Sequence, residues 1–253
     1  MPALLFKSIL KESSGKAVTA ERRSSQRFAL NPNFPLKSML SFIARDDTGE
    51  LMSNSREGWH WKGRLLDISE YGARLQLGPG LRAKVGDSCD LGLSIGEFNL
   101  SVPCHLVHLH EGDEGMVFGL RHEIDDSPTW AAYRQLIEVV ALGYTLKPQA
   151  TPARPDAGGY LVERFASPRP ARLTLWRQAE NKLLAAFEFV LKGNIVRAMA
   201  GSTPEYLTYV DGTAVHPAAT TRALEIHRLF QWVVPNLAPV VPDDVRGFLR
   251  NYI

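Results

Sequence analysis

Short apolar segments separated by turn residues run from residue 36 to residue 124, and no helical period connects them. Six segments are predicted as strands: LKSMLSFIAR (36–45), HWKGRLLDI (60–68), ARLQLG (73–78), SCDLGLSI (88–95), FNLSVPCHLVHLH (98–110) and GMVFGLRHEI (115–124). The intervening residues include glycine, aspartate and proline, which tight turns require. Six short strands in so short a stretch predict a small antiparallel β-barrel or sandwich.

A helical pattern follows the last of these strands, in SPTWAAYRQLIEVVAL. Ser127 is the expected N-cap, and Pro128 occupies the first helical position. Apolar positions then recur at helical spacing: Trp130, Tyr133, Leu136, Ile137 and Val140. We therefore predict a helix of about three to four turns that packs its apolar stripe against the barrel.

Residues 143–159 include LKPQATPARPDAGG, which is rich in proline and glycine and has no apolar period, so we predict a linker there. Residues 160–253 are predicted as an α+β domain. Its strands are YLVERFAS, ARLTLWR, KLLAAFEFVLK and NIVRAMAG, and its helices cover roughly 218–234 and 243–252. Residues 1–20 form an N-terminal arm, and 21–142 hold the barrel and its helix. The fold class is mainly β with two domains.

Charge is distributed unevenly along a chain of 253 residues whose net charge is only +2. Residues 1–30 hold six Lys and Arg against two Asp and Glu, which gives +4. Residues 31–142 hold ten against sixteen, which gives −6, and residues 143–253 hold thirteen against nine, which gives +4. A nucleic-acid polymer would require a strongly basic face, so a basic arm ahead of an acidic segment favours a small anionic partner.

The two cysteines, Cys89 and Cys104, lie in apolar strands and are predicted as buried free thiols. The first ten residues have no basic n-region and no small-residue cleavage site, and no run approaches the ~20 apolar residues of a membrane span. We expect a soluble, cytoplasmic protein with no membrane span.

Two short motifs flank the first part of the predicted barrel. ERRSSQRFAL (21–30) holds Arg22, Arg23 and Arg27, and DISEYGAR (67–74) is predicted as a turn between strands that end at Leu66 and begin at Ala73. In that turn Asp67 and Ser69 can bond the local backbone, and Gly72 can adopt a positive φ. Each motif alone is common by chance; together, in this order and around a barrel of this size, they are informative.

An R-x-x-x-R followed by D-x-S-x-x-G resembles the PilZ domain, a family of bacterial receptors for cyclic di-GMP (c-di-GMP). The resemblance covers roughly residues 20–142 and does not extend to the C-terminal domain. Thirty-nine residues separate Arg27 from Asp67, which is longer than the family pattern, and the polar insertion RDDTGELMSNSREGW accounts for the excess.

The resemblance implies a ligand and a role for each motif residue. Guanine presents N7 and O6 as adjacent acceptors, which a guanidinium matches with two hydrogen bonds. The ligand-binding set that it implies is Arg22, Arg23, Arg27, Asp67, Ser69, Gly72 and Arg74. Within that set, Arg23 and Arg27 would bind guanine edges and phosphate, and Asp67 would accept from the guanine N1 and N2 edge. Ser69 would contact base or phosphate, and Gly72 would let the ligand approach the backbone.

Arg22 adds a third guanidinium immediately before the motif. It is either a solvated side chain or part of a site that holds a second, stacked ligand molecule. No metal or other cofactor is expected, although CHLVHLH places Cys104, His108 and His110 on one predicted strand face. Ser24 and Ser25 have no companion histidine or aspartate that would make either a nucleophile.

The resulting hypothesis is a c-di-GMP receptor or adaptor, not an enzyme. Ligand binding would close the arm around residues 20–28 and change the arrangement of the two domains, and a protein effector would bind the C-terminal domain. The output would be motility, exopolysaccharide synthesis or biofilm formation. Two alternatives stay open: an interaction module with a non-binding PilZ barrel, and an enzyme with its site in residues 160–253. The oligomeric state stays open too.

Overall fold

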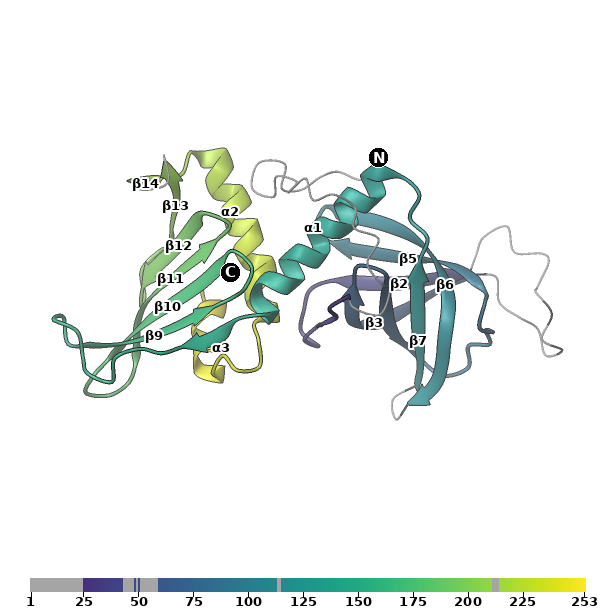
Figure 1. The fold of residues 1–253 in the computed structure, drawn as a ribbon, viewed down its shortest axis with the longest axis horizontal. Coiled ribbons are helices and arrows are strands. Elements are labelled where there is room, and N and C mark those ends of the chain that lie inside the picture. The colour runs from purple at the N-terminus through teal and green to yellow at the C-terminus, as the bar shows by residue number, and fades with distance from the viewer. Residues whose placement is uncertain (1–24, 43–47, 49, 51–58, 113–114, 211–213) are drawn as a thin grey trace. The chain divides into compact units, whose positions relative to one another are not determined.

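The structure, a computed structural model, describes residues 25–42, 48, 50, 59–112, 115–210 and 214–253. Contacts within the chain divide the described residues into two compact units, one that ends at Ile137 and one that begins at Glu138. Figure 1 shows a barrel in the first unit and a broad sheet with helices in the second. The mainly β fold class and the two folds predicted from the sequence are confirmed.

The first unit is a closed antiparallel barrel of six strands. They are β2 (Lys37–Phe42), β3 (Trp59–Ser69), β4 (Gly72–Leu77), β5 (Ser88–Ile95), β6 (Phe98–Gly112) and β7 (Gly115–His122). The hydrogen-bonded order β3-β2-β5-β6-β7-β4 closes because β4 also pairs with β3. A short strand, β1 (Phe28–Ala29), adds to β3. Alternate residues of each strand point into the barrel, so Leu91 and Leu93 of β5, for example, are fully buried.

Strand β6 departs from simple alternation at a register shift between Leu106 and His108. A bulge of this kind adds one residue and moves the following side chains to the other face. Cys104 is therefore buried, whereas His108 and His110 are exposed. The prediction that all three share one face was wrong, and the prediction of exposed histidines is confirmed.

Helix α1 (Ser127–Tyr144) follows the barrel and continues without a break from the first unit into the second. Asp126, not Ser127 as predicted, caps it: the Asp126 carboxylate accepts the backbone N–H of Thr129 at 2.8 Å, which lowers the pKa of Asp126. Near the other end, a Cβ at Gly143 would lie 2.8 Å from the Val233 carbonyl oxygen. Only glycine allows the helix to pack this closely on its neighbour.

The second unit contains a seven-stranded antiparallel sheet in which each strand pairs with the next in sequence. The strands are β8 (Lys147–Gln149), β9 (Tyr160–Ala166), β10 (Ala171–Gln178), β11 (Leu184–Leu191), β12 (Asn194–Met199), β13 (Glu205–Val210) and β14 (Ala214–Pro217). Strand β8 lies within residues 143–159, where the sequence predicted only a linker, and it pairs with β9. Backbone pairing orders this segment although it has no apolar pattern.

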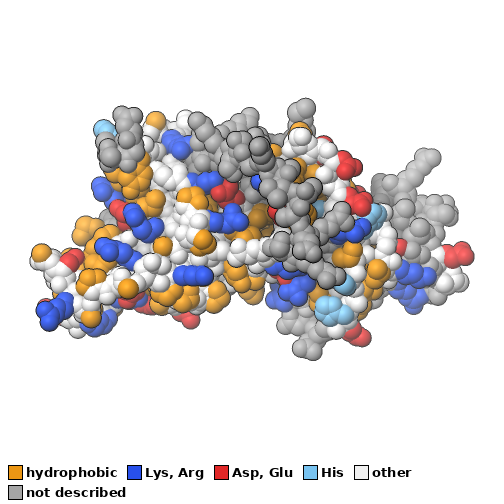
Figure 2. Space-filling model, viewed as in Figure 1, with side chains coloured by type: hydrophobic (Ala, Val, Ile, Leu, Met, Phe, Trp, Pro, Cys, Tyr) orange, Lys and Arg blue, Asp and Glu red, His pale blue; other side chains and the backbone are white. Residues whose placement is uncertain are grey.

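Three helical segments pack on one face of this sheet (Figure 1): α2 (Thr220–Val233), the 3₁₀ turn η1 (Val234–Asn236) and α3 (Asp243–Arg250). Phe187 of β11 stacks on Phe230 of α2 with ring centroids 5.8 Å apart, and Phe248 of α3 meets Phe187 edge-on at 6.0 Å. On the face of the second unit seen in Figure 2, Lys and Arg side chains are scattered among hydrophobic ones, not gathered into one basic patch.

Candidate functional site

The second motif, DISEYGAR, forms a tight hairpin between β3 and β4. Strand β3 extends through Asp67 to Ser69, and only Glu70 and Tyr71 form the turn before Gly72. The sequence placed the strand ends at Leu66 and Ala73. Pairing continues past them because a register shift between Leu65 and Asp67 accommodates Leu66. Asp67 thereby becomes the cross-strand partner of Arg74.

Two arginines converge on the carboxylate of Asp67. Arg27 Nη1 donates to Asp67 Oδ1 at 2.9 Å, and Arg74 Nε donates to Asp67 Oδ2. The side chain of Asp67 is only 3% exposed, whereas those of Arg27 and Arg74 are 53% and 51% exposed. A buried carboxylate thus holds two guanidinium groups whose side chains are about half exposed.

The first motif reaches this site through β1. Phe28 pairs with Ile68 and Ala29 pairs with Asp67, and the backbone N–H of Leu30 donates to the Leu66 carbonyl at 2.9 Å. Phe28 is buried and anchors the segment. Arg27 is therefore fixed beside Asp67 by local pairing, although the two residues are far apart in the sequence.

Ser69 and Gly72 stabilise the hairpin from within. Ser69 Oγ donates to the Gly72 carbonyl at 3.0 Å. A Cβ at Gly72 would lie 2.3 Å from the Leu120 carbonyl oxygen of β7, so glycine is required for the barrel to close at this point. This requirement differs from the role that the sequence suggested for Gly72, which was close approach by a ligand.

The hairpin is tied to helix α1 by a residue that the motifs do not contain. The hydroxyl of Tyr133, a fully buried side chain, donates to the Ser69 carbonyl at 2.9 Å and lies 3.1 Å from His122 Nε2. The rings of His122 and Tyr133 meet edge-on, 4.4 Å apart. Burial lowers the pKa of His122 to about 4, opposed by the backbone of Glu70, and burial raises the pKa of Tyr133 well above its ordinary value.

The structure therefore brings together Arg27, Asp67 and Arg74, with Ser69 and Gly72 directly beside them. Arg22 and Arg23 lie outside the described residues. Sequence reasoning missed Tyr133 and His122 as parts of this site. Tyr133 was assigned to the helix's apolar stripe, and a helical period cannot reveal that a buried hydroxyl reaches a backbone carbonyl of the motif.

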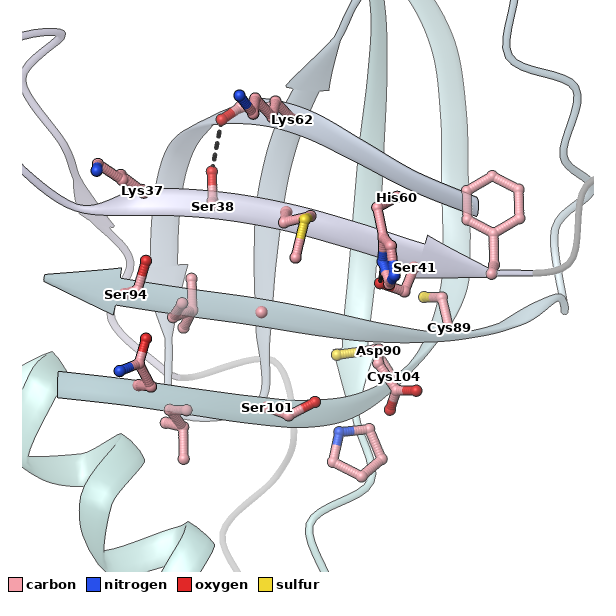
Figure 3. A pocket seen from close by; sticks show the side chains of 18 of the residues that line it. Lys37, Ser38, Ser41, His60, Lys62, Cys89, Asp90, Ser94, Ser101 and Cys104 are labelled. Carbon is pink, nitrogen blue, oxygen red and sulfur yellow. Dashed lines mark hydrogen bonds between the residues drawn. The ribbon is translucent and has the colours of Figure 1, made fainter. Parts of the chain in front are cut away.

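A separate open pocket of about 1200 Å³ lies on the barrel, lined by β2, β3, β5 and β6 (Figure 3). None of the described motif residues lines it. It contains two Ser–His pairs: Ser41 Oγ is 2.6 Å from His60 Nδ1, and Ser88 Oγ is 3.1 Å from His105 Nδ1. Glu123 lies 2.6 Å from His105 Nε2. These side chains meet because of the register between neighbouring strands, so their spacing in the sequence does not predict the pairs.

Cys89 and Cys104 also line this pocket, and they are register partners on β5 and β6 (Figure 3). Both are free and buried, as predicted. Burial raises the pKa of Cys89 to about 12 and that of Cys104 above its ordinary value, which makes both thiols poor nucleophiles. Among the described residues no group of His, Cys, Asp and Glu has the arrangement of a metal site. No described helix is long and apolar enough to cross a membrane.

A family model with the description "PilZ domain" matches residues 21–140. These residues are a PilZ domain. The match includes both motifs, the whole barrel and the part of α1 that contains Tyr133, and residues 141–253 lie outside it. The resemblance inferred from the two motifs is confirmed.

Solved structures that are similar to the PilZ domain have low sequence identity to this chain, and each match covers only part of the chain. The PilZ domain of YcgR from Escherichia coli with c-di-GMP is 14% identical, with a TM-score of 0.33, and the match covers 46% of this chain and 89% of that one. YcgR from Escherichia coli in complex with c-di-GMP is 13% identical, with a TM-score of 0.33, and the match covers 46% of this chain and 45% of that one. The MrkH–c-di-GMP complex of K. pneumonia is 12% identical, with a TM-score of 0.34, and the match covers 47% of this chain and 52% of that one.

This chain therefore matches about half the length of the last two proteins. A comparison with curated proteins gave no match. The assignment of the PilZ domain rests on the family model.

Proposed function

We propose that the protein is a c-di-GMP receptor that binds its ligand at the Arg27–Asp67–Arg74 cluster of the PilZ domain. The observation that carries the proposal is the convergence of two half-exposed guanidinium groups on one buried carboxylate. Each guanidinium has five N–H donors, so one bond to Asp67 leaves donors for guanine N7 and O6 or for phosphate oxygens. A cyclic dinucleotide with two phosphates and two guanines matches that donor set.

In this proposal Asp67 orients the arginines. Each of its oxygens accepts one arginine N–H and keeps a second lone pair, but its side chain is only 3% exposed, so little of it is open to direct contact with a guanine N1 edge. An orienting role needs no such access. Because Asp67 is buried, it also holds the two guanidinium groups more rigidly than an exposed carboxylate would.

Arg22 and Arg23 precede Arg27 by five and four positions in the sequence. We infer that both bind the ligand, Arg23 at guanine and phosphate and Arg22 at a second, stacked ligand molecule. Closure of residues 20–28 over the ligand would then change the arrangement of the two units. Through a protein effector of residues 160–253, this change would regulate motility, exopolysaccharide or biofilm output.

A competition experiment tests the proposal. Fluorescently labelled c-di-GMP is bound to the full chain and displaced with unlabelled c-di-GMP or c-di-AMP. We expect displacement by c-di-GMP at far lower concentration, because adenine has a donor at N6 where guanine has the O6 acceptor. Equal displacement by both would contradict the guanine-specific site, and no binding of the label would favour an interaction module with a non-binding barrel.

A further inference from the structure

The hydrogen bond between Tyr133 and Ser69 links the core of the PilZ domain to the motif hairpin. It joins a helix side chain that is fully buried to the backbone of the motif hairpin, 64 residues away in the sequence. The Ser69 carbonyl can only accept, so the Tyr133 hydroxyl is the donor. The bond therefore sets the position of the peptide unit that lies between the orienting carboxylate of Asp67 and the turn.

We propose that Tyr133 is the positioning residue of the c-di-GMP site and the point at which helix α1 senses the ligand. The inference rests on the proposed function and extends it. A ligand that engages the guanidinium groups on Asp67 pulls on the strand segment Asp67–Ser69, and the Ser69 carbonyl moves with it. A hydrogen bond weakens steeply with distance and angle, so even a small shift changes its strength.

The surroundings of the hairpin give it room for such a shift. A pocket of about 260 Å³ lies between the turn and the start of α1, lined by Glu70, Tyr71, His122, Asp126 and Trp130 among others. Side chains of the turn can therefore rearrange without opening the barrel core. By contrast, Tyr133 itself is held on two sides, by His122 and by the Ser69 carbonyl.

Helix α1 has the stiffness to carry the response onward. It is continuous from Ser127 to Tyr144, and Gly143 lies ten residues, or about 15 Å, beyond Tyr133. At that end Asn236 Nδ2 donates to the Val140 carbonyl at 3.2 Å, and the Ala238 N–H donates to the Gly143 carbonyl at 3.0 Å. The helix thus has specific anchors near both ends.

The test compares two tyrosine-to-phenylalanine variants of the full chain. Tyr133→Phe removes the hydroxyl that reaches Ser69. Tyr206→Phe removes a hydroxyl that also contacts a histidine, His227 at 2.7 Å, but lies in the unit without the PilZ site. We expect Tyr133→Phe to raise the Kd for c-di-GMP by about two- to tenfold, as for loss of one buried hydrogen bond, and Tyr206→Phe to leave it unchanged.

Hydrogen exchange with and without c-di-GMP gives a second readout. In the wild type we expect the ligand to slow amide exchange both in residues 67–74 and in residues 127–137 of α1. In Tyr133→Phe the protection of 67–74 remains and that of 127–137 is lost. A purely structural tyrosine would lower the melting temperature but leave the Kd and the α1 protection unchanged, and this result would overturn the inference.

The outcomes separate the inference from the function on which it rests. Wild-type binding without α1 protection would overturn the inference alone, and this measurement does not depend on whether Tyr133→Phe folds. Absence of c-di-GMP binding by the wild type would overturn the proposed function and the inference with it.

Discussion

At the scale of single residues, the site depends on a carboxylate that is expensive to bury. Asp67 has left water almost completely, and this is tolerated only because Arg27 and Arg74 each donate to one of its oxygens. The arginines keep half of their surface in solvent. The burial of one group therefore fixes the orientation of two exposed groups.

Gly72 gives a direct test of how the hairpin packs. Gly72→Ala would place a Cβ 2.3 Å from the Leu120 carbonyl oxygen, so we expect a loss of about 1–3 kcal/mol in the free energy of unfolding. Gly78 is the matched control, because a Cβ there meets no atom of the described chain within 4 Å. Urea denaturation should show Gly78→Ala within about 0.5 kcal/mol of the wild type. Equal losses in both variants would contradict the packing described.

His122 predicts a dependence of stability on pH. Burial lowers its pKa to about 4 from 6.5, so between these values the unfolded chain binds a proton that the folded chain does not. The contribution of His122 to the free energy of unfolding is fully present above pH 6.5. It falls by about 2–3 kcal/mol as the pH is lowered towards 4. Three carboxylate side chains, those of Glu70, Asp125 and Asp126, line the same pocket as His122.

The variant His122→Gln separates the histidine from these carboxylates, which it leaves in place. We expect its free energy of unfolding to fall less between pH 7 and pH 4.5 than that of the wild type, as measured by urea denaturation at both values. Parallel losses in the two proteins would show that the carboxylates alone set the pH dependence.

The sequence could predict the motif residues but not their partners. Arg27, Asp67, Ser69, Gly72 and Arg74 follow from two spaced motifs around a barrel. Asp67 binds two arginines because strand register brings them together, and Tyr133 reaches its partners through tertiary packing. A local sequence pattern predicts neither set of contacts.

At the scale of elements, hydrophobic alternation located all six barrel strands because each has one buried face. It failed for β8, whose three residues are all exposed, and it also missed β13 and β14. These strands form because their neighbours offer backbone hydrogen bonds. It also placed His108 and His110 on the same face as Cys104, since a bulge leaves no trace in residue spacing.

One ion-pair cluster joins α3 to the sheet of the second unit. Arg177 of β10 donates to Glu163 at 2.8 Å and to Asp244 of α3 at 2.6 Å, and its side chain is mostly buried. Arg177→Ala leaves both carboxylates without this partner. Because both are partly exposed, we expect a loss of about 1–3 kcal/mol in the free energy of unfolding.

Arg197→Ala is the control in the same sheet. Arg197 of β12 pairs at 2.8 Å with Glu205, both side chains are more than half exposed, and such surface pairs contribute little. Denaturation should show a change within about 0.5 kcal/mol. If Arg197→Ala destabilised the chain as much as Arg177→Ala, the special role of Arg177 would be wrong.

At the scale of the whole molecule, two units with separate cores share one continuous helix. The PilZ domain supplies the proposed input site, and the seven-stranded sheet with its helices supplies the proposed surface for an effector. The uneven charge fits this division, since a basic N-terminal segment precedes an acidic barrel. Tyr133 places the proposed link between ligand and helix inside the PilZ domain.

Calorimetric titration of the full chain with c-di-GMP tests the central claim most directly. We predict saturable binding by the wild type and a Kd raised about 10- to 100-fold in Arg27→Ala, because each guanidinium–guanine contact is worth about 1–3 kcal/mol. Arg197→Ala is the control, since it removes an exposed arginine paired with Glu205 in the other unit; its Kd should equal that of the wild type. No heat of binding in the wild type, or equal affinity in Arg27→Ala, would contradict the account.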